Sequence, residues 1–96
     1  MIPYSRQCIT KADIEAVSRV LGSDWLTQGP KAKEFEEKLA RFVGSRFAVS
    51  FSSGTAALQA AYFAAGIKPG DEVITSPLTF AATANMALWQ GAKVVF

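Results

Sequence analysis

The chain has 96 residues and half of them are hydrophobic, so it is long enough for one small domain with a buried core. Its net charge is only +2, with basic and acidic residues interleaved, which argues against nucleic-acid binding, and no apolar stretch is long enough to span a membrane. There is no histidine and one cysteine, Cys8, which excludes Ser-His-Asp and Cys-His catalysis and an internal disulfide within these residues. We expect a cytoplasmic protein with no metal site.

The first part of the sequence, residues 1–44, predicts a helical segment. Thr10-Lys11-Ala12-Asp13 resembles a capping box, and the apolar residues after it have helical spacing, so we expect a helix over residues 11–21. Pro30 suits the first turn of a second helix, and Gly44 fits the residue that ends it.

The second part, residues 45–96, predicts the start of an α/β sheet in which strands and helices alternate. We expect strands over 46–51, 72–75 and 93–96, and helices over 55–65 and from Thr79, as the N-cap, to about residue 90. This alternation predicts βαβ units and a mainly parallel sheet. Parallel sheets need cover on both faces, and the sequence ends inside an apolar strand, so we expect the N-terminal fragment of a longer protein.

The turn Ser52-Ser53-Gly54-Thr55 follows the first predicted strand and leads into an Ala-rich helix. One interpretation is an ordinary connection with a serine or threonine N-cap. The other is a phosphate site, because a helix N-terminus presents free N–H groups, the hydroxyls add donors, and Gly54 allows close approach. The Walker and dinucleotide-binding glycine patterns are both missing.

A second turn, residues 76–80, follows the next strand and is expected at the same edge of the sheet. Phe80 in this turn fits either a core position at a helix start or an aromatic platform for a planar heterocycle. Together the two turns suggest a flat, phosphorylated cofactor. The earlier loop, residues 25–30, fits either a tight link between helices or a segment that reaches a substrate or a partner subunit.

The sequence resembles the DegT/DnrJ/StrS sugar aminotransferases, which are pyridoxal 5'-phosphate (PLP) enzymes of fold type I. The resemblance covers essentially the whole chain and rests on five ordered motifs: Ser23-Asp24-Trp25-Leu26-Thr27-Gln28-Gly29-Pro30, Phe35-Glu36, Ser53-Gly54-Thr55-Ala56-Ala57-Leu58, Pro69-Gly70-Asp71-Glu72-Val73-Ile74 and Thr79-Phe80-Ala81-Ala82-Thr83-Ala84-Asn85. It implies the N-terminal portion of the large domain of an aspartate aminotransferase-like fold. The opening residues and the run after Phe80 are most similar to the branch that aminates a UDP-linked 4-keto-6-deoxy sugar on the route to pseudaminic acid.

The resemblance also implies site residues and partners. The cofactor phosphate would be held by the backbone amides of Gly54, Thr55 and Ala56 and by the Thr55 hydroxyl, and Phe80 would stack on the pyridine ring. Substrate-binding residues would be Tyr4, Thr27, Gln28 and Gly29. The family pocket forms at a homodimer interface and takes a nucleotide sugar and an amino-acid donor, usually glutamate.

The resemblance places the family's cofactor-binding lysine and its pyridine-partner aspartate beyond residue 96. None of the lysines in this sequence lies in the lysine motif, so we expect the fragment itself to be inactive, with no catalytic residue of its own. In fold type I, later strands lie between the first strand and the next two. We therefore expect residues 46–51 to lack a neighbour and the fragment to fold poorly alone.

Two alternatives stay open at this stage. A dehydratase branch of the same family uses histidine in place of the lysine and removes oxygen instead of transferring an amino group. A non-catalytic α/β module that binds a phosphate ligand at the Gly54-Thr55 turn is an alternative from another class.

Overall fold

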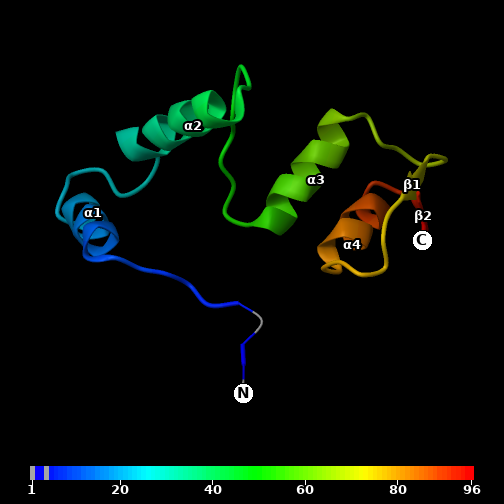
Figure 1. Ribbon diagram of the computed structural model, residues 1–96. Helices are drawn as coiled ribbons and strands as arrows, with labels where there is room; N and C mark the ends of the chain where they lie inside the picture. The colour runs from blue at the N-terminus through cyan, green and yellow to red at the C-terminus, as the bar shows by residue number, and fades with distance from the viewer. Residues whose placement is uncertain (1, 4) are drawn as a thin grey trace. The chain divides into compact units, whose positions relative to one another are not determined.

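The computed structural model describes residues 2–3 and 5–96, and the chain divides into two compact units, Met1–Ala48 and Val49–Phe96 (Figure 1). The N-terminal unit holds helices α1 (Lys11–Leu21) and α2 (Pro30–Val43). The C-terminal unit holds, in chain order, α3 (Gly54–Ala64), β1 (Glu72–Ile74), α4 (Ala82–Trp89) and β2 (Lys93–Val95). No helix in the described part of the chain combines the length and the apolar character that crossing a membrane requires.

Helix α1 begins at the predicted capping box. The Thr10 hydroxyl accepts from the Asp13 amide at 3.4 Å, and the Asp13 carboxylate accepts from the Thr10 amide at 2.7 Å. Donation by the Thr10 amide, and then by its hydroxyl, holds the pKa of Asp13 below its usual value. The helix begins where the sequence predicts, because both halves of this cap lie within four residues, and it also ends at the predicted residue, Leu21.

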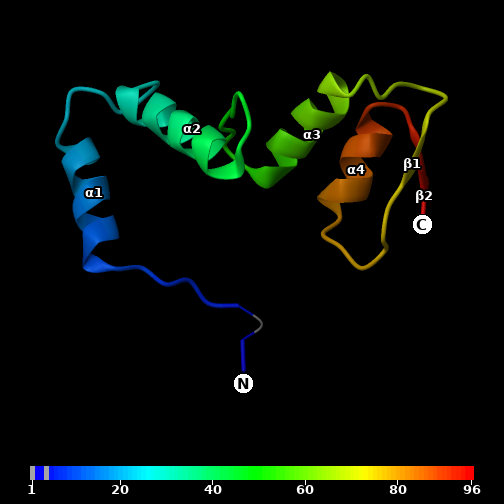
Figure 2. The same ribbon diagram turned by 45° about the horizontal axis from the view of Figure 1, so that its top comes forward.

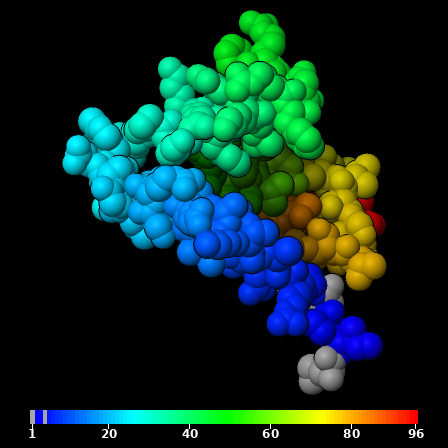
Figure 3. Space-filling view, turned by 60° about the vertical axis from the view of Figure 1, so that its left-hand side comes forward, coloured from blue at the N-terminus to red at the C-terminus, as the bar shows by residue number. Residues whose placement is uncertain are grey.

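Helix α2 is also set by local signals. Pro30 occupies its first turn, and Gly44 ends it in the left-handed conformation with φ 71°. On its exposed surface Glu34 pairs with Lys31 and with Lys38, the latter at 2.6 Å. These two ammonium groups lower the pKa of Glu34 to about 2. Most side chains of α1 and α2 lie on the surface (Figure 3).

The C-terminal unit contains the predicted βαβ element. Strands β1 and β2 pair in parallel, with Glu72 opposite Lys93 and Ile74 opposite Val95, and α4 forms the crossover between them. Helices α3 and α4 pack against each other, and in both ribbon views their N-terminal ends point toward the same end of this unit (Figures 1 and 2). The parallel sheet and the positions of α3, β1 and β2 confirm the predictions to within one residue at each element's start.

Two predictions for this region are wrong. Residues 46–51 form no strand, because a strand needs a ladder partner and β1 and β2 pair only with each other in the described chain. Thr79 does not cap α4, which begins at Ala82 after the N-cap residue Ala81. The Thr79 hydroxyl lies 3.3 Å from the Thr83 hydroxyl instead, so it links the turn before the helix to the helix's first turn.

The buried core of the described residues consists of small side chains: Ala40, Ala82, Ala87 and Ala92. Large apolar side chains stay exposed, among them Phe63 and Trp89, which are 75% and 72% accessible. Sequences of α3 and α4 are apolar on all sides, a pattern typical of interior helices. Few large side chains are therefore buried among the described residues, and poor folding of these residues alone stays a prediction.

Gly91, between α4 and β2, is held against Pro69. Its φ is 81°, and an added Cβ atom would lie 2.7 Å from Pro69 Cγ. Gly66 has a similar φ of 78°, yet an added Cβ there would meet nothing within 4 Å. A side chain at Gly66 would thus meet backbone strain alone, whereas one at Gly91 would meet backbone strain and steric overlap with Pro69.

We predict that Gly91→Ala lowers the free energy of unfolding more than Gly66→Ala does. Both changes place a Cβ at positive φ, at a cost of roughly 1–2 kcal/mol, and Gly91→Ala adds overpacking of about 1–3 kcal/mol. Urea unfolding of the full-length protein measures the difference. Pro69→Ala should recover part of the excess in the Gly91→Ala background, and equal losses for the two glycines would contradict the prediction.

Candidate functional site

The first turn of α3 is an N-terminus with an open face. Ser53 is the N-cap, and its Oγ accepts from the Ala56 amide at 3.2 Å. The amides of Gly54 and Thr55 have no hydrogen-bond partner among the described residues. A Cβ built on Gly54 would meet nothing within 4 Å, so a ligand can approach this backbone closely. The turn is therefore an ordinary serine cap that still leaves two amides to donate.

The turn after β1 presents an aromatic ring. The Ser76 hydroxyl accepts from the Leu78 amide at 3.1 Å, and the Phe80 carbonyl accepts from the Thr83 amide at 3.1 Å. The Phe80 side chain is 78% exposed, so it takes no part in the core of its own unit. An exposed phenyl ring at the carboxyl end of a parallel strand is suited to stack on a planar ligand.

Two hydrogen bonds join the helices that follow these turns. The Tyr62 hydroxyl donates to the Thr83 carbonyl at 3.0 Å, and Gln90 Nε2 donates to the Gln59 carbonyl at 3.5 Å. Sequence reasoning missed both bonds. The only signal for the first was a tyrosine in an Ala-rich helix, since a partly buried tyrosine hydroxyl usually finds a partner.

The C-terminal unit brings no free cation to the α3 turn. Its two basic side chains, Lys68 and Lys93, pair with Asp71 at 3.7 Å and with Glu72 at 2.7 Å. Lys68 precedes β1 and Lys93 opens β2, so both lie at the amino ends of the strands, whereas Phe80 follows the carboxyl end. Within this unit, an anion at the α3 turn would be held by amides and hydroxyls alone.

The predicted substrate segment lies in the N-terminal unit, in the loop between α1 and α2. Gln28 has a left-handed φ of 50°, which is uncommon for a residue with a side chain. A Cβ added to Gly29 would lie 3.0 Å from Trp25 Cβ, and the Ser23 hydroxyl donates to the Val20 carbonyl at 2.7 Å. Gly29 thus lies close to the Cβ and backbone of Trp25, whose side chain stays largely exposed. Tyr4, the other predicted substrate residue, lies outside the described residues.

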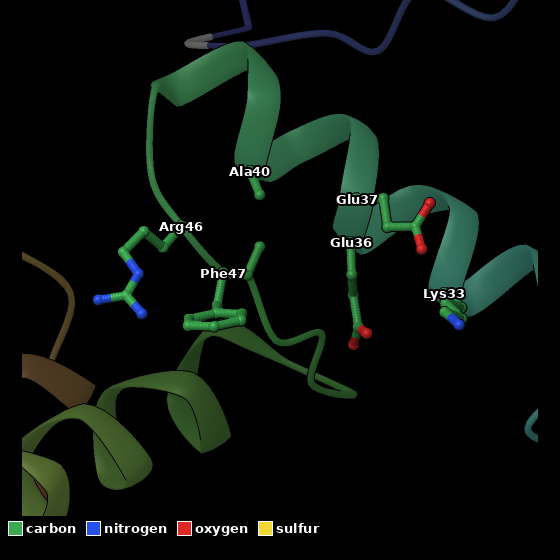
Figure 4. Close-up of a pocket in the computed structure, with 7 residues that line it drawn as sticks. Lys33, Glu36, Glu37, Ala40, Arg46 and Phe47 are labelled. Atoms are coloured by element: carbon green, nitrogen blue, oxygen red, sulfur yellow. The ribbon is translucent and has the colours of Figure 1, made fainter.

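Each unit has a surface hollow among its described residues. That of the N-terminal unit, of about 380 Å³, contains none of the predicted site residues and mixes charges of both signs; Lys33, Glu36, Glu37, Ala40, Arg46, Phe47 and Ala48 line it (Figure 4). That of the C-terminal unit, about 430 Å³, is largely apolar and includes Ala56 of the α3 turn; its other residues are Phe51, Gln59, Ala60, Phe63, Trp89 and Gln90. The described residues contain no group of three or more acidic, histidine or cysteine side chains placed to hold a metal ion.

Comparisons of sequence and of structure with known proteins indicate the same family. Residues 7–96 match the model of the DegT/DnrJ/EryC1/StrS aminotransferase family. The chain is 51% identical over 96 residues to the UDP-4-amino-4,6-dideoxy-N-acetyl-beta-L-altrosamine transaminase of Campylobacter jejuni, covering all of this chain and 25% of that protein. It spans about a quarter of the length of the curated relatives that it matches.

Solved structures agree in fold. Helicobacter pylori PseC, described as an aminotransferase in the biosynthesis of pseudoaminic acid, matches with a TM-score of 0.90 and 44% identity over 98% of this chain and 26% of its own. NtdA from Bacillus subtilis, solved with bound cofactor PMP, matches with a TM-score of 0.80 and 34% identity over 92% of this chain and 21% of its own. These matches confirm the predicted fold class, part of the α/β large domain of fold type I aminotransferases. The chain belongs to the DegT/DnrJ/EryC1/StrS aminotransferase family.

Proposed function

We propose that this chain supplies part of the cofactor cradle of a PLP-dependent aminotransferase. The reaction is transfer of an amino group from an amino acid, with glutamate as the expected donor, to a nucleotide-linked 4-keto-6-deoxy sugar. The observation that carries the proposal is the pair of turns in one unit: free amides at the start of α3 and the exposed Phe80 ring after β1. The names of the Campylobacter and Helicobacter relatives support an amino-sugar product and a place in pseudaminic acid biosynthesis.

The residues of the α3 turn fit a phosphate. The Gly54 and Thr55 amides are available, the Thr55 side chain is exposed, and the open space at Gly54 leaves room for phosphate oxygens. The Ala56 amide, predicted as a third donor, already donates to Ser53 Oγ, so it would have to share or release that hydroxyl to bind a phosphate oxygen. We keep Ala56 in the proposed site as a donor that the ligand must recruit.

Phe80 fits the ring of the same cofactor. Its side chain is exposed at the start of the turn that leads into α4, and stacking on a flat heteroaromatic ring would cover that surface. PLP bound there would supply an electron sink for amino transfer. The residues of this chain would hold and orient the cofactor, and we assign none of them to proton transfer.

The loop between α1 and α2 is the proposed substrate segment. Thr27 and Gln28 provide a hydroxyl and an amide, and Gly29 lies against the Cβ and backbone of Trp25. Tyr4 remains a proposed contact to the nucleotide sugar. A homodimer, implied by the family resemblance, and a cytoplasmic location, expected from the single cysteine, complete the proposal.

The proposal is tested by loading the purified full-length protein with PLP and following its visible absorbance. Addition of glutamate should convert the bound cofactor to its amino form, and addition of the keto-sugar nucleotide should restore the starting spectrum and yield an amino sugar. Loss of a sugar hydroxyl without net amination would assign the dehydratase branch instead. A protein that takes up no PLP but binds another phosphate compound would be the non-catalytic module.

We predict that Thr55→Val weakens PLP binding while Thr55→Ser does not. The valine keeps the shape of threonine and removes one hydrogen bond to a charged phosphate, which is worth about 1.5–3 kcal/mol. Equilibrium titration of the apoenzyme with PLP measures the change. Equal affinities for the two variants would show that the Thr55 hydroxyl makes no contact with the phosphate.

Phe80→Leu should also weaken PLP binding, by roughly 0.5–1.5 kcal/mol beyond the loss of buried area, because leucine cannot stack on the ring. Phe80→Tyr keeps an aromatic face and serves as the matched control. The same titration gives both values. If leucine binds PLP as tightly as tyrosine does, the ring of Phe80 is not the platform.

Gly29→Ala tests the substrate segment. The added methyl group would press on Trp25, and displacement of the loop should raise KM for the keto-sugar roughly two- to tenfold, the equivalent of one hydrogen bond. Gly22→Ala is the control, because a Cβ there would come no closer than 3.6 Å to its neighbours. Steady-state kinetics with saturating glutamate would contradict the proposal if both variants had the wild-type KM.

A further inference from the structure

Tyr62 links the helix that carries one turn of the proposed cofactor site, α3, to the helix that follows the other turn, α4. It lies on α3, and its partly buried hydroxyl donates to the carbonyl of Thr83, 21 residues later in the first turn of α4, at 3.0 Å. Helices α3 and α4 pack against each other, and the buried side chains of α4 are the small Ala82 and Ala87. A directional bond in such a contact fixes how far one helix can slide or rotate against the other.

Helix α4 is less stable by itself than α3, so a bond to a neighbouring helix should stabilise it more. It has only eight residues, and its N-cap, Ala81, has no side chain that can accept from the first amides. Short helices without caps are marginal by themselves. Helix α3, by contrast, is capped by Ser53 through the Ala56 amide. The Tyr62 hydroxyl does not replace the missing cap, because it donates to a carbonyl, but it ties the first turn of α4 to α3.

Thr83 passes this restraint to Phe80. The Thr83 amide donates to the Phe80 carbonyl at 3.1 Å, and the Thr83 hydroxyl lies 3.3 Å from that of Thr79. Thr83 is thus bonded on one side to α3 and on the other to the turn that carries the exposed ring. The atoms involved all belong to the C-terminal unit.

We propose that Tyr62 is a positioning residue for Phe80. Through Thr83, its hydroxyl holds the ring-bearing turn in a fixed relation to α3, whose first turn would bind the phosphate of the same cofactor. This inference rests on the proposed function, and it adds a residue that does not touch the cofactor itself. The geometry predicts that loss of the hydroxyl lets the ring platform shift while each turn stays intact.

The test compares Tyr62→Phe with Gln90→Met in the full-length holoenzyme. Each variant removes one of the two side-chain hydrogen bonds between α3 and α4 and keeps a side chain of similar size. Tyr62→Phe should raise the dissociation constant of PLP roughly two- to tenfold, as expected for one neutral hydrogen bond, and should change the circular dichroism of the bound cofactor. Both variants should lower Tm to a similar extent, because each loses one hydrogen bond, whereas Gln90→Met should leave both cofactor signals unchanged.

A second measurement shows whether the effect passes through Phe80. In the Phe80→Leu background, Tyr62→Phe should weaken PLP binding less than it does in the wild type, because the platform is already missing. Full additivity, or equal cofactor effects of Tyr62→Phe and Gln90→Met, would reduce Tyr62 to a structural residue and overturn the proposal. If the wild-type protein binds no PLP, the proposed function fails and this role fails with it; wild-type PLP binding with an unaffected Tyr62→Phe variant overturns only the role of Tyr62.

Discussion

The parallel pairing of β1 with β2 is the constraint on which the C-terminal unit depends. The Thr75 amide donates to the Val95 carbonyl at 3.0 Å, and the Lys93 amide donates to the Asp71 carbonyl at 2.9 Å, which extends the ladder at both ends. Parallel strands cannot be joined by a tight hairpin, so the chain between them must cross over. That crossover is α4, and the turn before it is where Phe80 lies. The backbone ladder thereby determines that the aromatic turn opens at the carboxyl edge of the sheet.

Features set by neighbouring residues could be predicted from the sequence. The capping box of Thr10 and Asp13, the start of α2 at Pro30 and its left-handed end at Gly44 involve partners no more than a few residues away. The start of α3 belongs to the same class, because Ser53 caps its own helix. For the site, the two turns after the predicted strands could be recognised because both follow an apolar run directly.

Features set by distant partners could not be predicted. Residues 46–51 have the composition of a strand, yet composition does not supply the neighbour that a ladder needs, and in the described chain no neighbour is paired with them. Thr79 has the right side chain for a cap, but the path of the crossover starts α4 at Ala82 and turns the Thr79 hydroxyl to Thr83. The bond between Tyr62 and Thr83 joins residues 21 positions apart and has no periodic signal in the sequence.

The α3 turn offers only weak electrostatic attraction, so ligand binding there should depend more on the relative position of the two turns than on any single contact. The C-terminal unit has two basic and two acidic side chains, paired with each other at the amino ends of its strands, so it offers no ammonium group to a bound phosphate. Its amides and the helix dipole provide only partial charges, which act over about one helical turn. Within this unit, binding of a phosphorylated planar molecule must therefore combine these donors with stacking on a ring carried by another element. Such a combination is effective only if the distance between the two turns matches the ligand, and the packing of α3 on α4 sets that distance.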